Sequence, residues 1–110
     1  MIQRALTTLP EMLKRSGYVT AAIGKYHVGM DFDDGHGEPA DKFDFQDVDF
    51  TKPIQNTAIV NGFDEYFGIA ASLDMPPYVF IRNDRVTEQP TSSLKEEDKG
   101  GRQGPAVPGW

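Results

Sequence analysis

The sequence predicts an α/β fold, because a short amphipathic helix is followed at once by an apolar stretch of strand length. Apolar residues recur at helical spacing over residues 9–13, and residues 18–23 are then almost continuously apolar. A third signal is a β-hairpin near residues 78–87. With 110 residues, the chain has room for one domain at most.

The predicted helix begins with a capping box. Thr8 is the expected N-cap and Glu11 stands three residues later, so each side chain can bond a backbone N–H of the first turn. Pro10 is compatible with a first turn, and Gly17 is the expected residue just after the helix end. The apolar stripe predicts that this helix lies against a sheet.

Residues 18–23 predict a strand that is apolar on both faces, as is typical of a buried position in a sheet. Gly24 ends this strand, and Lys25 and His27 follow it. If the chain stays extended there, the two side chains lie on the same face. Open α/β sheets bind ligands at the carboxyl ends of their strands, and a lysine beside an imidazole suits chemistry on sulfate or phosphate.

The middle of the chain predicts little regular structure. Residues 31–50 are acidic and rich in glycine, which is typical of a long loop. Residues 51–61 have room for a short turn. Residues 62–68 are aromatic and bounded by glycines, and we expect a short helical or irregular segment there.

The hairpin is predicted from two short runs of strand-forming residues. The runs are 78–81 and 85–87, and Asn83 with Asp84 supplies the turn between them. Beyond the hairpin, residues 88–110 are rich in Pro, Ser, Lys, Glu and Gly. We expect a loop there.

Composition excludes several classes of protein. A net charge of -6 and a pI near 4.7 argue against nucleic-acid binding, which normally requires a basic surface. No apolar run approaches the roughly 18 residues of a membrane span. The sequence contains no cysteine, and its first residues do not form a signal peptide.

Two familiar site motifs are also excluded. Six residues separate Gly17 from Gly24, where a phosphate-binding loop has four, and Tyr26 stands where that loop has Ser or Thr. Residues 31–38 do not fit an EF-hand, because the glycine and the last carboxylate fall at the wrong positions. This stretch is predicted to be a solvated acidic loop.

Residues 9–29 closely resemble the second signature of the sulfatase family. They contain its leucine-proline helix start, its Gly-Tyr-x-Thr and its Gly-Lys-aromatic-His-aliphatic-Gly, with Tyr26 where tryptophan is commoner. Later segments resemble, in order, the continuation of the bacterial arylsulfatase-type members. These segments are 52–56, 62–69, 72–78 and 104–109.

The resemblance implies an alkaline-phosphatase-like α/β/α sandwich and hydrolysis of sulfate esters on a sulfated small molecule or glycan. It implies a formylglycine nucleophile, made within Cys/Ser-x-Pro-x-Arg, and a calcium ion that polarises the sulfate. By the same resemblance, Lys25 contacts sulfate oxygens, and His27 bonds the hydrated formylglycine and assists collapse of the sulfated intermediate. Asp74, with the turn at 75–78, either borders the substrate cleft or belongs to a rigid structural turn.

The sequence has neither a cysteine nor a Ser-x-Pro-x-Arg motif. We therefore expect residues 1–110 to be an internal part of a sulfatase catalytic domain, and the sequence does not decide whether Met1 is the true start. The nucleophile and the calcium ligands are expected outside these residues, and the isolated chain is expected to be marginally stable and inactive. A phosphoester or phosphonate hydrolase of the same superfamily and a non-catalytic binding module remain as alternatives. Family members are often periplasmic, secreted or lysosomal, and the sequence does not choose between these compartments.

Overall fold

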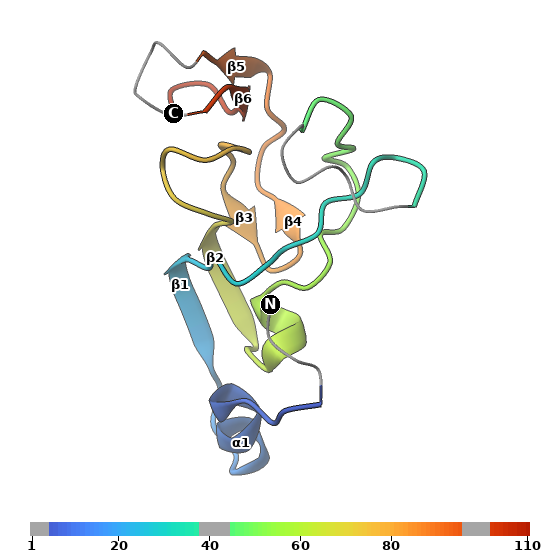
Figure 1. Cartoon of the computed structure of the whole chain (residues 1–110). Helices are drawn as coiled ribbons and strands as arrows, with labels where there is room; N and C mark the ends of the chain where they lie inside the picture. The colour runs from blue at the N-terminus through green and yellow to red at the C-terminus, as the bar shows by residue number, and fades with distance from the viewer. Residues whose placement is uncertain (1–4, 38–44, 96–101) are drawn as a thin grey trace.

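The computed structural model describes residues 5–37, 45–95 and 102–110. Their elements in chain order are α1 (Leu9–Arg15), β1 (Ala21–Lys25), the 3-10 helix η1 (Ala58–Asn61), β2 (Glu65–Ile69), β3 (Ile81–Arg82), β4 (Arg85–Val86), β5 (Ser92–Leu94) and β6 (Gly104–Ala106). One sheet has the order β1-β2-β3-β4, and β5 pairs with β6 in a second sheet (Figure 1). The predicted α/β class is confirmed.

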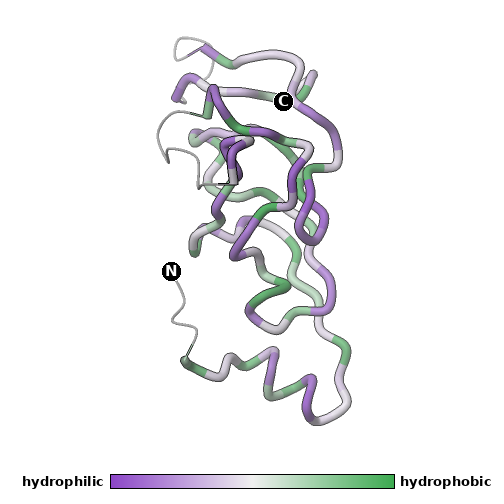
Figure 2. Tube along the Cα trace, turned by 90° about the vertical axis from the view of Figure 1, so that its right-hand side faces the viewer, coloured by the Kyte–Doolittle hydropathy of each residue, from purple (hydrophilic) through white to green (hydrophobic). Residues whose placement is uncertain are grey.

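Helix α1 begins with the predicted capping box. The Thr8 hydroxyl accepts the N–H of Glu11 at 3.4 Å, and the Glu11 carboxylate accepts the N–H of Thr8 at 3.0 Å. The prediction that α1 packs on a sheet is wrong, because Leu9 is 67% exposed and Met12 is 56% exposed. Hydrophobic and hydrophilic residues alternate along this helix, which lies at the end of the molecule opposite the C-terminus (Figure 2).

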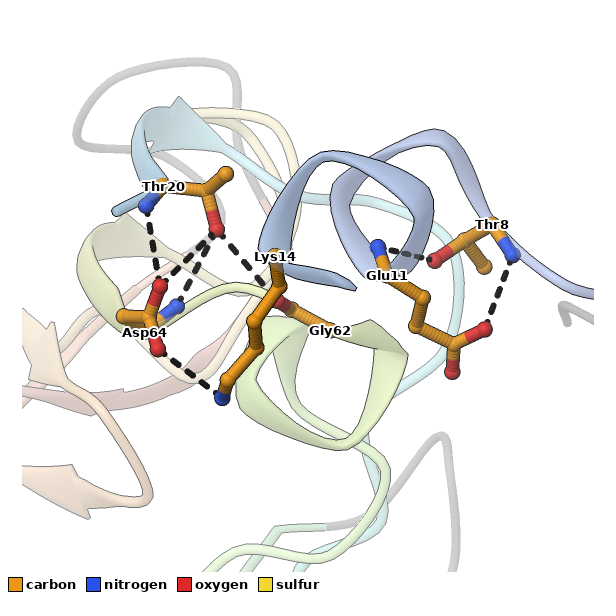
Figure 3. Close-up of polar contacts among 6 residues, drawn as sticks. All are labelled: Thr8, Glu11, Lys14, Thr20, Gly62 and Asp64. Carbon is orange, nitrogen blue, oxygen red and sulfur yellow. Dashed lines mark hydrogen bonds and ion pairs between the residues drawn. The ribbon is translucent and has the colours of Figure 1, made fainter. Parts of the chain in front are cut away.

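Polar contacts hold α1 instead, and Asp64 is their centre (Figure 3). Its carboxylate lies 2.8 Å from Lys14 Nζ and accepts the N–H of Thr20 at 2.9 Å. The contact with Lys14 and the bond from Thr20 hold the pKa of Asp64 below its ordinary value. At the other end of α1, the Thr8 hydroxyl donates to the carbonyl of Asn61 at 2.6 Å. The helix is thus fastened to the segment that leads into β2.

Strand β1 pairs in parallel with β2, in a register that runs from Ala21 opposite Glu65 to Lys25 opposite Ile69. The strand begins and ends later than predicted, so Lys25 is its last residue and does not follow it. The predicted burial is also wrong, since Ile23 is 85% exposed. The physical reason is that β1 is an edge strand and α1 does not cover it.

Strand β2 lies where a helical or irregular segment was predicted, so that prediction is wrong. Tyr66 and Gly68 are buried while Glu65 and Phe67 are exposed, which is the alternation of a strand. Gly68 permits the close approach of β1, because a Cβ atom there would lie 1.8 Å from the carbonyl oxygen of Gly24. The predicted turn at 51–61 contains η1, which ends at a left-handed glycine.

The predicted hairpin is confirmed, with shorter strands than expected. Ile81 pairs with Val86, and the two-residue turn contains Asn83 at a φ of 58°. Asparagine tolerates this left-handed conformation better than most residues do. Tyr78, expected within the first hairpin strand, instead forms an isolated parallel bridge with Ala106.

The expected loop at 88–110 contains the antiparallel pair of β5 and β6. Residues 96–101 of that range and residues 38–44 of the long loop predicted at 31–50 lie outside the described residues. Within the described part of the chain, seven buried side chains pack together as the main hydrophobic cluster. They are Phe32, Ile54, Ala58, Tyr66, Val79, Ile81 and Val107. Among the described helices, none is long and apolar enough to cross a membrane.

Candidate functional site

The candidate residues Lys25 and His27 lie at the end of β1 and just beyond it. Beyond Lys25, the bonding to the segment after β2 continues, since Tyr26 N–H donates to the carbonyl of Ile69 at 3.1 Å and His27 N–H to that of Ala70 at 2.9 Å. His27 has a φ of 50°, which is uncommon for a residue other than glycine. The chain is therefore not extended there, and the argument that alternation places Lys25 and His27 on one face does not hold.

The Lys25 ammonium lies at an exposed position near the end of β2. Its Nζ atom is 3.5 Å from the hydroxyl oxygen of Ser72. In residues 5–37, 45–95 and 102–110, the ion pairs join Lys14 to Asp64 and Arg82 to Glu65, so no carboxylate there neutralises Lys25. This positive charge is consequently available to an external anion.

His27 borders a pocket of about 180 Å³. Its lining comes from the segment after β1, the segment after β2 and Phe45. The lining residues are His27, Gly29, Met30, Asp31, Phe32, Phe45, Ala70, Ala71, Met75, Pro76 and Pro77. The structure thus brings the turn after Asp74 next to His27, while the exposed Asp74 is not part of the lining. A substrate role for Asp74 stays a prediction.

A buried tyrosine, which the sequence analysis missed as a site residue, fixes the strand ends beneath Lys25. The Tyr66 hydroxyl bonds the carbonyl oxygens of Gly24 at 3.1 Å and Ile69 at 2.9 Å. Ile69 is the residue paired with Lys25, so both strands are tied at this level. Burial, with a smaller contribution from Tyr26, raises the pKa of Tyr66 to about 12.

Tyr26, the first residue after β1, is also anchored. The Tyr26 ring lies 5.8 Å from that of Tyr66, and its hydroxyl oxygen accepts a bond from the Asn61 side chain. Burial raises the pKa of Tyr26, against the lowering effect of the Asn61 bond. The residues on both sides of Lys25 are therefore held from within the fold. The sequence signal for Tyr66 is its spacing of two residues from Gly68. In a strand, this spacing places both residues on the same face, so the signal can be used only once β2 is known to be a strand.

Metal-binding groups are sparse in the part of the chain that the structure describes, where no cluster of three or more His, Cys, Asp or Glu side chains could hold an ion. The acidic residues of the 31–37 segment serve local structure. Asp31 accepts a bond from the Asn56 side chain, and Asp33 accepts the N–H of Gly35 at 2.7 Å. The described residues do not fit a calcium site.

Comparison with known proteins gives a consistent result. Residues 2–100 match the family model described as Sulfatase. The chain is 35% identical over 86 residues to an N-acetylgalactosamine-6-O-sulfatase of Bacteroides thetaiotaomicron, a match covering 78% of this chain and 14% of that protein. It is 41% identical over 69 residues to arylsulfatase G of Mus musculus, a match covering 63% of this chain and 9% of the mouse protein.

A solved structure shares the fold. The structure was described in work on the metabolism of multiple glycosaminoglycans by Bacteroides thetaiotaomicron. It matches this chain with a TM-score of 0.60 at 35% sequence identity. The match covers 78% of this chain and 15% of that one. The chain thus spans about one seventh of the length of the Bacteroides proteins it matches.

Proposed function

The chain belongs to the sulfatase family, and we propose that it is part of an enzyme that hydrolyses sulfate esters. The observation that carries this proposal is the Lys25 ammonium at the carboxyl end of β1, which pairs with no carboxylate of the described residues and stands two positions before His27, a lining residue of the pocket. A ligand site at this end of a parallel strand pair is the usual arrangement in α/β folds.

Lys25 is proposed to bind the sulfate oxygens. A positive charge held beside these oxygens stabilises their negative charge in the transition state of ester cleavage. The anchoring of Gly24 and Tyr26 supports this role, because it limits the movement of the backbone that carries the ammonium. A charge fixed before the reaction needs no reorganisation during it.

His27 is proposed to move a proton at the reacting group. An imidazole ring has two nitrogen atoms, one of which can accept a proton while the other donates one. It borders the pocket, where a bound ester would place its reacting atoms within reach. The left-handed backbone at His27 supports a functional role, since strained conformations cluster at active sites.

The formylglycine and the calcium ion implied by the family resemblance are assigned to residues outside these 110. The sequence has no cysteine and no Ser-x-Pro-x-Arg motif, and the described residues offer no calcium site. We therefore derive no reaction step through either group. The proposed substrate class is a sulfated small molecule or glycan, with Asp74 as a polar contact near the cleft.

The test uses the protein that carries this sequence, assayed with 4-nitrophenyl sulfate and 4-nitrophenyl phosphate. We expect faster turnover of the sulfate, and a loss of about 100-fold or more in kcat for His27→Gln. The matched control is His36→Gln, because His36 is exposed and lies outside the pocket. Faster turnover of the phosphate would favour a phosphoester hydrolase, and turnover of neither would favour a binding module; both results contradict the proposal.

A further inference from the structure

The turn that follows η1 contains an asparagine-glycine pair whose glycine the fold requires. Asn61 is the last residue of η1, and Gly62 caps it with a φ of 100°. A side chain at position 62 would be strained at this φ, and its Cβ atom would lie 2.5 Å from Cγ and 2.8 Å from N of Glu11 in α1. The residue directly after Asn61 must therefore be glycine.

Asn61 is a point of attachment for two other parts of the chain. Its carbonyl oxygen accepts a bond from the Thr8 hydroxyl at 2.6 Å, which fastens the start of α1. Its side-chain amide donates to the Tyr26 hydroxyl, and to the carbonyl of Thr57 at 3.3 Å. A chemical change at Asn61 would consequently act on both α1 and the segment after β1.

Gly62 belongs to the same attachment. Its carbonyl oxygen accepts a bond from the Thr20 hydroxyl at 3.3 Å (Figure 3). Thr20 also donates its N–H to Asp64, the carboxylate that holds Lys14 of α1. The fastening of α1 thus depends on the main-chain geometry at residues 61–62.

An asparagine that precedes a glycine is chemically labile. Asparagine is one of the thermolabile residues, and the main-chain nitrogen of a following glycine reaches the side-chain amide carbon with no Cβ in its way. The fold restrains this reaction, because Gly62 N–H donates to the carbonyl of Ile59 at 3.1 Å and the Asn61 amide is bonded twice. The reaction therefore requires local opening of η1, which has only four residues.

We propose that Asn61 is a site of spontaneous deamidation, with water as the reagent. The Gly62 nitrogen gives its proton to hydroxide and forms a bond to Asn61 Cγ, the bond from Cγ to Nδ2 breaks, and ammonia leaves with a proton from water. Water then opens the cyclic imide at either carbonyl group. The products are aspartate and isoaspartate at position 61.

Both products weaken the attachment. A carboxylate at position 61 cannot donate, so the Thr57 carbonyl oxygen loses its partner and faces a negative charge. Isoaspartate also adds one carbon to the main chain, which displaces the carbonyl groups that Thr8 and Thr20 bond. The modification releases α1 and removes the amide that holds Tyr26.

The first test maps deamidation by peptide mass spectrometry in the protein that carries this sequence, kept in mildly alkaline buffer with and without urea. The internal controls are Asn56 and Asn83, which are followed by threonine and aspartate. In urea we expect Asn61 to convert about tenfold or more faster than either control. In the folded protein we expect Asn61 to convert about tenfold or more slowly than in urea, through opening of η1.

Two results of this mapping would overturn the proposal. One is a folded protein in which Asn61 stays intact until the urea-treated sample is fully converted. The other is conversion of Asn56 or Asn83 as fast as Asn61 in urea. The mapping needs only the wild type, so it decides the site whether or not a variant folds.

The second test measures urea midpoints of Asn61→Asp, which is the direct hydrolysis product. The matched control is Asn83→Asp, because the Asn83 side chain accepts the N–H of Tyr66 at 2.9 Å and a carboxylate accepts it equally well. We expect a lower midpoint for Asn61→Asp and the wild-type midpoint for Asn83→Asp. A wild-type midpoint for Asn61→Asp would contradict the weakened attachment.

Discussion

The hydroxyl oxygen of Tyr66 lies 3.1 Å from the carbonyl oxygen of Gly24, the residue immediately before Lys25. The same hydroxyl bonds the carbonyl of Ile69, which stands opposite Lys25 in the neighbouring strand. A side chain that is only 2% exposed therefore ties together the two strand ends at the candidate site. The backbone that carries Lys25, the proposed sulfate-binding residue, is thus held in place by a side chain from the interior of the fold.

Replacing Tyr66 with phenylalanine keeps the ring and removes this link. The part-buried carbonyl oxygens of Gly24 and Ile69 then lose a partner, so we expect the free energy of unfolding to fall by about 1–2 kcal/mol. Urea unfolding of the variant and the wild type measures the difference. Tyr18→Phe is the matched control, since Tyr18 is 62% exposed and its change is expected to have no effect. Equal midpoints for the two variants would show that the link contributes nothing.

Stability is expected to fall at alkaline pH because of the same residue. Burial raises the pKa of Tyr66 from 10.0 to about 12, so the folded state retains a proton that the unfolded chain gives up first. Unfolding then releases a proton, and stability declines between about pH 10 and 12 by up to about 1.4 kcal/mol per pH unit. Unfolding titrations of wild type and Tyr66→Phe check this, since the variant is expected to show a shallower decline.

Acid sensitivity is expected from Asp64. Its contacts with Lys14 and Thr20 lower its pKa, so the folded state favours the carboxylate. The stability that these contacts contribute is present above the ordinary aspartate pKa and is lost as the pH falls through the lowered value. Asp64→Asn should remove this part of the acid dependence, whereas Asp47→Asn at an exposed position should not. Identical acid unfolding profiles for Asp64→Asn and wild type would contradict this assignment.

Gly68 is expected to tolerate no side chain. A Cβ atom there would lie 1.8 Å from the Gly24 carbonyl oxygen, so Gly68→Ala must push β1 and β2 apart, at a cost of about 2–3 kcal/mol. Gly17→Ala is the control for backbone strain alone. Gly17 has a φ of 88°, and no atom lies near the position of an added Cβ, so the substitution causes strain without a clash. We expect the Gly17 change to cost only about 1 kcal/mol. A smaller loss at Gly68 than at Gly17 would contradict the close approach.

The elements set by local chemistry were predictable from the sequence. The capping box of Thr8 and Glu11 and the turn at Asn83 depend on residues a few positions apart, and both were predicted correctly. Strand β2 was not predictable, because a short aromatic run bounded by glycines fits an irregular packed segment as well as a strand. Tyr66 and Gly68 are buried in alternation with exposed residues because β2 pairs with β1 in the sheet, and this pairing is not visible in the local sequence. Strands β5 and β6 depend on pairing between residues ten to fourteen positions apart, which composition does not reveal.

The candidate site was predictable in part. A motif of adjacent residues drew attention to Lys25 and His27, and the structure places both at the carboxyl end of β1. The left-handed backbone of His27 and the Tyr66 bond beneath Lys25 were not foreseen. The Tyr66 bond depends on the parallel pairing of β1 with β2, in which the partner residues lie more than forty positions apart.

The central claim is that Lys25 binds the sulfate group in the reaction. The most direct measurement is kcat/KM for 4-nitrophenyl sulfate in the protein that carries this sequence, for wild type, Lys25→Met and the exposed-lysine control Lys52→Met. We predict a loss of about 100-fold or more for Lys25→Met and wild-type activity for Lys52→Met, because loss of one group that stabilises an oxyanion has this magnitude. Wild-type kcat/KM in Lys25→Met would contradict the claim.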